Sequence, residues 1–192
     1  QMLSDDVSLE VDHVTSTWAH VYASQDTLVL AEPANDWWWF WRNSGWDDAT
    51  NIHSFDISDP NHTTYIASGR VNGTVQDQFS MSEHEGSIRV ASTSDMWGRW
   101  WLSTELNENG EPIWTGPSNQ VTILQDDGEG TLSQVGFVGG IAEGEQIWSA
   151  RFVGDRGYLV TFMNIDPLWV LDLSDPSNPT VLGELEVPGV ST

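Results

Sequence analysis

The sequence contains a nine-residue stretch in two copies, Ile52-His53-Ser54-Phe55-Asp56-Ile57-Ser58-Asp59-Pro60 and Leu168-Trp169-Val170-Leu171-Asp172-Leu173-Ser174-Asp175-Pro176. Asp172 follows Asp56 by 116 residues, and the match continues at the same offset from residues 64–73 to residues 180–189. Another unit lies between the copies, with residues 121–125 in the corresponding place. Because each copy is a strand-like run that ends in a turn, the chain repeats a whole structural unit.

Around these copies the chain consists of short apolar or alternating runs bounded by Gly, Asp, Asn or Pro, with almost no helical periodicity. This pattern predicts an all-β fold. The runs form three sets of four expected strands, at 18–23, 27–31, 51–57 and 64–71, at 78–82, 87–93, 120–125 and 132–138, and at 146–152, 157–162, 168–173 and 180–187. Short polar turns join several of the pairs, which is typical of tight hairpins.

Four strands per repeat predict a β-propeller of about three four-stranded blades, whereas a β-sandwich would not require the internal copying. We expect blade-like units at about 14–73, 74–142 and 143–192, with insertions at 34–49 and 94–117. Propellers usually close with about four to eight blades. Three blades leave an open arc with apolar end faces. Residues 1–192 are therefore expected to be part of a larger closed propeller, whose remaining blades lie in another chain or protomer.

The charge of the chain is strongly one-sided, with six Lys+Arg against 29 Asp+Glu and a formal net charge of −23. All six basic residues are arginine. A surface this negative repels phosphate groups, so nucleic acid is not an expected partner. A high-salt habitat would favour such a lysine-free, acidic composition, because salt screens the self-repulsion. An ordinary secreted acidic protein is the alternative.

Several classes of chemistry find no support in the sequence. There is no cysteine, which excludes disulfides and thiolate sites. No apolar run approaches the roughly 18 residues of a membrane-spanning helix. HExxH, GxSxG, P-loop and GxGxxG motifs are lacking, so no catalytic residue is predicted. His20 and His53 are the one histidine pair expected on strands of a single unit, where they could meet.

Nine of the twelve tryptophans lie in the two insertions. The candidate contact residues there are Trp37, Trp38, Trp39, Trp41, Arg42, Trp46, Trp97, Arg99, Trp100 and Trp101. Each insertion follows the second strand of its unit, so both are expected on the same face of the propeller. Indole rings stack on sugars or cations and anchor protein interfaces, which indicates a protein or glycan ligand. The alternative is that the two loops pack on each other, since three successive tryptophans cannot all face one side.

The repeated turns offer the one metal candidate. Asp56, Asp59, Asp172 and Asp175 supply carboxylate oxygens of the kind that calcium prefers, which makes calcium a weak cofactor candidate. The competing interpretation is a type I turn in which Asp accepts backbone N–H bonds and Pro sets φ. The recurrence of the motif at equivalent blade edges favours the turn.

Two segments carry a resemblance to a known family. They are Asp77-Gln78-Phe79-Ser80-Met81 and Ser149-Ala150-Arg151-Phe152-Val153-Gly154-Asp155-Arg156-Gly157-Tyr158-Leu159-Val160-Thr161-Phe162, and residues 164–168 and 171–176 extend them. Together they resemble the secreted bacterial and archaeal β-propeller domain family over about residues 17–192. The chain departs from the family in the Trp-rich insertions.

The resemblance implies a location outside the cytoplasm, either extracellular, at the cell surface or in the periplasm. It supplies no established reaction. The function expected is therefore a binding or assembly module that uses the Trp-rich face. Two alternatives stay open. One is part of a secreted enzyme whose active site is completed by the missing blades, and the other is a purely structural surface subunit.

Overall fold

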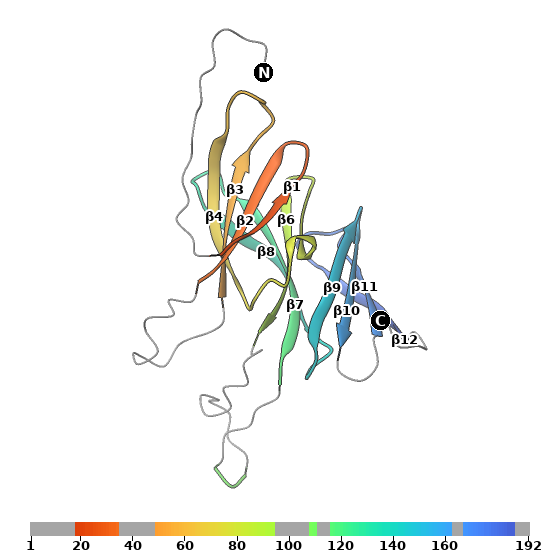
Figure 1. Cartoon of the computed structure of the whole chain (residues 1–192). Coiled ribbons are helices and arrows are strands. Elements are labelled where there is room, and N and C mark those ends of the chain that lie inside the picture. The colour runs from red at the N-terminus through yellow and green to blue at the C-terminus, as the bar shows by residue number, and fades with distance from the viewer. Residues whose placement is uncertain (1–17, 35–48, 95–107, 111–115, 163–166, 187–192) are drawn as a thin grey trace.

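The computed structural model of the 192-residue chain describes residues 18–34, 49–94, 108–110, 116–162 and 167–186. The strands of these residues form three antiparallel sheets (Figure 1). The first sheet holds β1 (His20–Ala23), β2 (Thr27–Pro33), β3 (Ala49–Asp56) and β4 (Thr64–Asn72). The second holds β5 (Met81–His84), β6 (Ser87–Ser94), β7 (Ser118–Asp126) and β8 (Leu132–Ile141). The third holds β9 (Gln146–Val153), β10 (Arg156–Phe162), β11 (Pro167–Asp172) and β12 (Thr180–Glu186).

Each sheet is a meander in which strands that follow one another in the chain also pair in space. The repeated stretch occupies β3 and β11, the third strands of their sheets, and residues 121–125 lie in β7, the third strand between them. The prediction of three four-stranded antiparallel units is therefore confirmed. Among the described residues, no helix has the length and apolar character needed to cross a bilayer.

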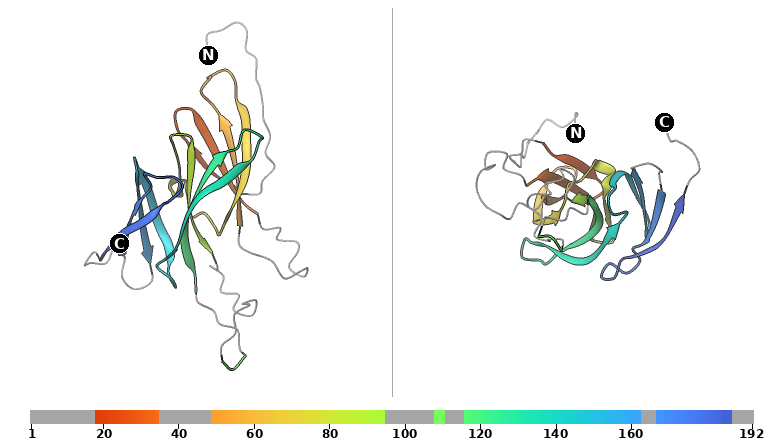
Figure 2. Two further views of the ribbon diagram at one scale, coloured as in Figure 1. Left: turned by 180° about the vertical axis from the view of Figure 1, so that it is seen from behind. Right: turned by 90° about the horizontal axis from the view of Figure 1, so that it is seen from below.

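The second sheet lies between the other two, as the views in Figure 2 show. Val90 and Leu124 point to the first sheet and belong to one apolar cluster. Ala91, Val121 and Ile123 point to the third sheet and belong to another. Because successive side chains of a strand alternate between faces, β6 and β7 are buried on both sides. The first and third sheets thus pack on opposite faces of the second, and the arc is open.

One expected strand starts later than predicted. The run 78–82 was expected to be extended, but Gln78–Ser80 forms a short 3₁₀ helix, and β5 begins at Met81. The cause is the side chain of Asp77. Its Oδ1 accepts hydrogen bonds from the backbone N–H groups of Phe79 and Ser80 at 2.9 and 3.1 Å. A capping carboxylate of this kind satisfies the free N–H groups of a helical turn.

Two glycines let the outer strands approach the neighbouring sheet. A Cβ on Gly69 of β4 would collide with the backbone of Leu132 in the second sheet. A Cβ on Gly136 of β8 would collide with the carbonyl oxygen of Pro176 in the β11–β12 turn of the third sheet. At both positions the missing side chain lets the backbones of neighbouring sheets come close together.

Candidate functional site

The Trp-rich insertions leave the fold after β2 and β6, but their tryptophans and arginines lie outside the described residues. The structure does describe the strand ends on either side of the two insertions. Thr50 Oγ1, at the start of β3, donates to the carbonyl oxygen of Gly73 at 2.8 Å. The next residue, Thr74, exchanges two backbone hydrogen bonds with Thr93 near the end of β6. The strand ends of both insertions are therefore joined through residues 73–74.

A buried asparagine stabilises the base of the second insertion. Asn119 of β7 is 0% exposed, and its Oδ1 accepts a hydrogen bond from Thr93 Oγ1 at 2.7 Å. Its Nδ2 donates to the carbonyl oxygens of Ile141 at 2.8 Å and Glu145 at 3.1 Å. Thr93 Oγ1 also accepts from the backbone N–H of Ile147 in the third sheet. One amide thus connects β6, β7, the end of β8 and the turn that leads to β9.

The aspartates that were calcium candidates lie in turns of the expected kind. Asp56 and Asp59 accept backbone N–H bonds from the residues two positions later at 2.8 and 2.9 Å. Asp172 and Asp175 do the same at 3.0 Å each, and each also accepts the serine hydroxyl at 2.7 Å. Among the described ranges, no group of three or more His, Cys, Asp or Glu side chains could hold a metal ion.

These turns predict a titration behaviour. Hydrogen bonds from Ser58 and Ser174 lower the pKa of Asp56 and Asp172 from the usual 3.8, because they stabilise the charged form. A carboxyl group whose pKa is lower in the folded state stabilises the fold above its unfolded pKa. That contribution is lost as the pH falls through the folded pKa. An NMR pH titration should therefore give both carboxyl carbons midpoints below 3.8.

The matched variant is Ser174→Ala, which should move the midpoint of Asp172 towards 3.8 and leave that of Asp56 unchanged. Arg156 also lowers the pKa of Asp172, through its positive charge and a hydrogen bond, so the shift should be partial. A midpoint of Asp172 that does not respond to the variant would contradict the prediction.

A polar network that the sequence did not reveal covers part of the outer face of the first sheet, the face turned away from the second sheet. Glu32 Oε1 lies 3.4 Å from His53 Nε2 and accepts from Asn51 Nδ2 at 3.3 Å. His53 Nδ1 lies 3.1 Å from the hydroxyl oxygen of Tyr65, and Arg70 Nε donates to Asn51 Oδ1 at 3.0 Å. Only the pairing of β2, β3 and β4 brings these side chains together.

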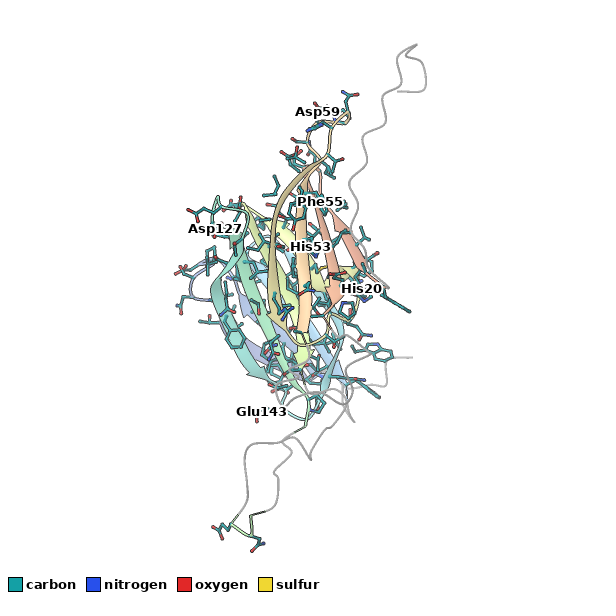
Figure 3. The ribbon with its side chains drawn as sticks, turned by 90° about the vertical axis from the view of Figure 1, so that its left-hand side faces the viewer. His20, His53, Phe55, Asp59, Asp127 and Glu143 are labelled. Atoms are coloured by element: carbon teal, nitrogen blue, oxygen red, sulfur yellow. The ribbon has the colours of Figure 1, made fainter. Side chains whose placement is uncertain are left out.

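The expected meeting of two histidines in this unit was wrong. His20 pairs with Ala31 and Ala31 with Ile52, so the three share the face that points to the second sheet. His53 follows Ile52 and points to the opposite face. Figure 3 shows the two histidines on different strands of the sheet.

The outer face of the third sheet, turned away from the second sheet, carries an apolar patch. We call it the third-sheet patch, and it consists of Tyr158, Val160, Phe162, Leu168, Val170 and Leu185. Phe162 and Leu185 are 47% and 58% exposed, and the ring of Phe162 lies 5.9 Å from that of the exposed Trp148. Their neighbours Leu159 and Leu171 point inwards and are fully buried.

The repeat shows what this patch corresponds to. At the offset of 116 residues, Leu168 and Val170 occupy the positions of Ile52 and Ser54 in the first sheet. Ile52 and Ser54 are 0% and 4% exposed, because the second sheet covers them. The third sheet therefore presents to solvent the face that the first sheet buries.

Comparison with known proteins identifies a family that agrees with the observed sheets. A family model described as "Beta propeller domain" matches residues 2–192. A protein of Methanocaldococcus jannaschii, described as uncharacterized, is 37% identical over 142 residues, which is 74% of this chain and 18% of the relative. An uncharacterized protein of Archaeoglobus fulgidus is 33% identical over 157 residues, which is 77% of this chain and 21% of the relative. The chain thus matches about a fifth of the length of these curated relatives.

Proposed function

Because the chain belongs to the beta propeller domain family, we propose that it supplies three blades of a larger closed propeller that acts as an extracytoplasmic binding or assembly module. The observation that carries the proposal is the third-sheet patch. Two of its residues, Leu168 and Val170, stand at positions that the first sheet buries against its neighbour. A further blade packed on the patch would bury it in the same way. Each fully buried aliphatic side chain stabilises such a contact by about 1.5–3 kcal/mol.

The first experiment is native mass spectrometry of the natural protein. A mass well above the 21.4 kDa of this chain, in a single polypeptide or in an assembly with other blades, is expected. A stable monomer of 21.4 kDa would rule out the closed propeller.

A variant separates burial of the patch from simple surface chemistry. In the natural protein Leu168→Glu should destabilise the fold by roughly 2–4 kcal/mol, because it places an unpaired charge in a blade interface. In the 192-residue chain alone, where Leu168 is partly exposed, the same change should cost about 0.5 kcal/mol or less. Thermal unfolding of both forms measures the difference.

The control is Phe137→Glu at another exposed apolar residue, 48% exposed on β8. It should cost little in either form. Equal effects of Leu168→Glu on the natural protein and on the chain alone would refute burial of the patch.

Within the same proposal the Trp-rich insertions form the contact surface. The support is that the strand ends that lead into the two insertions are joined through residues 73–74, and that the two insertions contain nine of the twelve tryptophans. Trp100→Ala should then weaken binding of a protein or glycan ligand by about tenfold or more, as loss of an interface indole typically does. Phe137→Ala, at an exposed aromatic residue of β8 outside the third-sheet patch and the insertions, is the control, and a glycan array with the two variants tests the pair.

A purely structural subunit is the second candidate, and the third-sheet patch also favours it. In that case the natural assembly would still bury Leu168, but Trp100→Ala would leave every interaction of the assembly unchanged. The proposed location outside the cytoplasm is supported by the resemblance to secreted propellers. Fractionation of the source cells tests it.

A further inference from the structure

The two gaps between neighbouring sheets open at the same end of the fold. This is the end with the hairpin turns of β1–β2, β5–β6 and β9–β10, opposite the strand ends that carry the insertions. Figure 3 shows Asp59 and Asp127, in the β3–β4 and β7–β8 turns, towards this end, with Glu143 at the other. The two gaps differ in the side chains that line them: one contains a buried arginine, and the other is an open groove.

An arginine of the chain itself fills the gap between the second and third sheets. Arg89 of β6 is 4% exposed and lines a small cavity of about 20 Å³. Its Nε donates to Ser82 Oγ at 2.8 Å, and its Nη1 donates to the carbonyl oxygen of Gly154 at 2.6 Å. The guanidinium carbon lies 5.2 Å from the ring centroid of Phe152. This gap therefore shows how the fold accommodates a guanidinium between two sheets.

The nearby carboxylates complete this environment. Burial lowers the pKa of Arg89, whereas the charges of Asp155 and Glu83 raise it. An arginine side chain stays charged in proteins, so burial of this group needs hydrogen-bond acceptors and negative charge around it. The gap between the second and third sheets thus holds a buried cation together with hydrogen-bond acceptors and negative charge.

The gap between the first and second sheets is larger, and in the described part of the chain no arginine side chain fills it. It forms a groove of about 330 Å³. Its floor is apolar and its rim is acidic, with Phe55, Ile66, Ile88 and Leu132 below and Asp26, Asp56, Glu83 and Asp126 around it. No arginine or histidine is among the described residues that line it. We call this site the acidic groove.

A buried hydroxyl group in the acidic groove is left without a partner. Ser54 lines the groove, is 4% exposed and lies on the face of β3 that points to the second sheet. Within the described part of the chain, its side chain makes no hydrogen bond. A buried polar group without a partner costs about 1–3 kcal/mol. The equivalent position in the third sheet holds Val170, so the blade does not need a hydroxyl there.

We propose that the acidic groove binds an arginine side chain of a protein partner, in the way that the neighbouring gap holds Arg89. The methylene stem of the arginine would cover the apolar floor, and the guanidinium would face Ser54 Oγ and the carboxylates of Asp26, Asp56 and Asp126, since the charge of Glu83 already acts on Arg89. A guanidinium suits this site because it combines planar apolar faces with five N–H donors. The net charge of −23 attracts such a partner from a distance. This site is separate from the third-sheet patch and from the Trp-rich insertions, so it does not depend on the function proposed for them.

The test uses the 192-residue chain and two capped amino acids at about 0.15 M ionic strength, where long-range attraction is screened. N-acetyl-arginine amide should bind, with NMR shifts at Ser54, Ile88 and Leu132. N-acetyl-citrulline amide has the same shape without the charge and should bind about tenfold more weakly or not at all, because hydrogen bonds to charged groups contribute about 1.5–3 kcal/mol. Equal binding of both compounds would overturn the proposal.

Two variants locate the site. Asp26→Asn combined with Asp126→Asn should weaken arginine binding about tenfold. The control combines Asp59→Asn and Asp175→Asn, which removes the same charge from turns that do not line the groove. If the control pair weakens binding as much, the attraction is only that of the whole acidic surface, and the proposal fails.

Ser54→Val tests the hydroxyl independently of charge. Valine stands at the equivalent position 170, so the variant should fold with an unchanged or higher melting temperature and bind arginine several-fold more weakly. Free L-arginine distinguishes the source of the ligand. Free L-arginine has the same net charge as the capped form, because its α-ammonium offsets its carboxylate, so clearly tighter binding of the free form would mean that the groove recognises the α-groups of a free amino acid and would overturn the protein partner. Stronger binding of Ca²⁺ at the same residues would identify a metal site and overturn the proposal as well.

Discussion

Replacement of Asn119 by leucine should lower the free energy of unfolding by about 3–5 kcal/mol, which is the largest effect that we expect from a single polar substitution in this chain. Leucine has nearly the shape of asparagine, so no large cavity forms. It leaves the carbonyl oxygens of Ile141 and Glu145 without their side-chain donor. It also removes the acceptor of Thr93 Oγ1.

The size of the effect follows from the position of Asn119. The side chain is fully buried, and water cannot easily replace the lost hydrogen bonds. Urea unfolding followed by circular dichroism measures the change. Asn61→Ala is the control, because Asn61 is exposed and, among the described residues, its Nδ2 donates to Asp59 Oδ1 alone, at 3.1 Å. It should cost about 0.5 kcal/mol or less. A loss below about 1 kcal/mol for Asn119→Leu would contradict the role of Asn119 in holding β6, β7, the end of β8 and the following turn together.

The second large effect is expected for Gly136→Val, at about 3 kcal/mol of lost stability. The new Cβ would collide with the carbonyl oxygen of Pro176 and lie 3.0 Å from the ring Cδ of Pro179. A backbone carbonyl cannot rotate away as a flexible side chain can. The β11–β12 turn would therefore have to separate from β8, and part of the contact between the second and third sheets would be lost.

Gly183→Val provides a matched control in β12, the strand of the third sheet that corresponds to β8. A Cβ at Gly183 has no heavy atom within 4 Å, and valine favours strands. The control should therefore be neutral or slightly stabilising in the 192-residue chain. Thermal unfolding of the two variants gives the comparison, and equal melting temperatures would show that strand propensity outweighs the collision.

The fold could be predicted from the sequence because each four-stranded blade repeats the same pattern of short apolar strands. Ile52 and Leu168, at equivalent positions, already mark the third strand of a blade. The strand start at Met81 could not be predicted this way. It depends on a hydrogen-bond geometry of Asp77 that an alternating pattern does not contain. Tertiary pairing also decides which side chains share a face, and the contact of Glu32 with His53 across β2 and β3 is an example.

The candidate sites divide in the same way. Tryptophan content alone pointed to the insertions. The carboxylates of the acidic groove come from the β1–β2 turn, β3, β5 and β7, and their spacing in the sequence does not predict that they lie close together. Arg89 did leave a signal, since a single charge between Ile88 and Val90 in an apolar run is unusual for a buried strand. Only the packing of the third sheet on Arg89, through the ring of Phe152 and the carbonyl oxygen of Gly154, shows why that charge is tolerated.

The outer faces of the first and third sheets differ chemically, so the two ends of the arc are not equivalent. The outer face of the third sheet presents Val160 and Leu168, whereas the outer face of the first sheet combines Val21 and Leu30 with the carboxylate of Glu32 and the imidazole of His53. A filament of identical copies stacked end to end would press these polar groups against the aliphatic side chains at every junction, and each junction would carry the cost of dehydrating them. Polymerisation of this kind is therefore disfavoured. A partner that covers Leu168 must bring an apolar surface of its own, different from the opposite end of this chain.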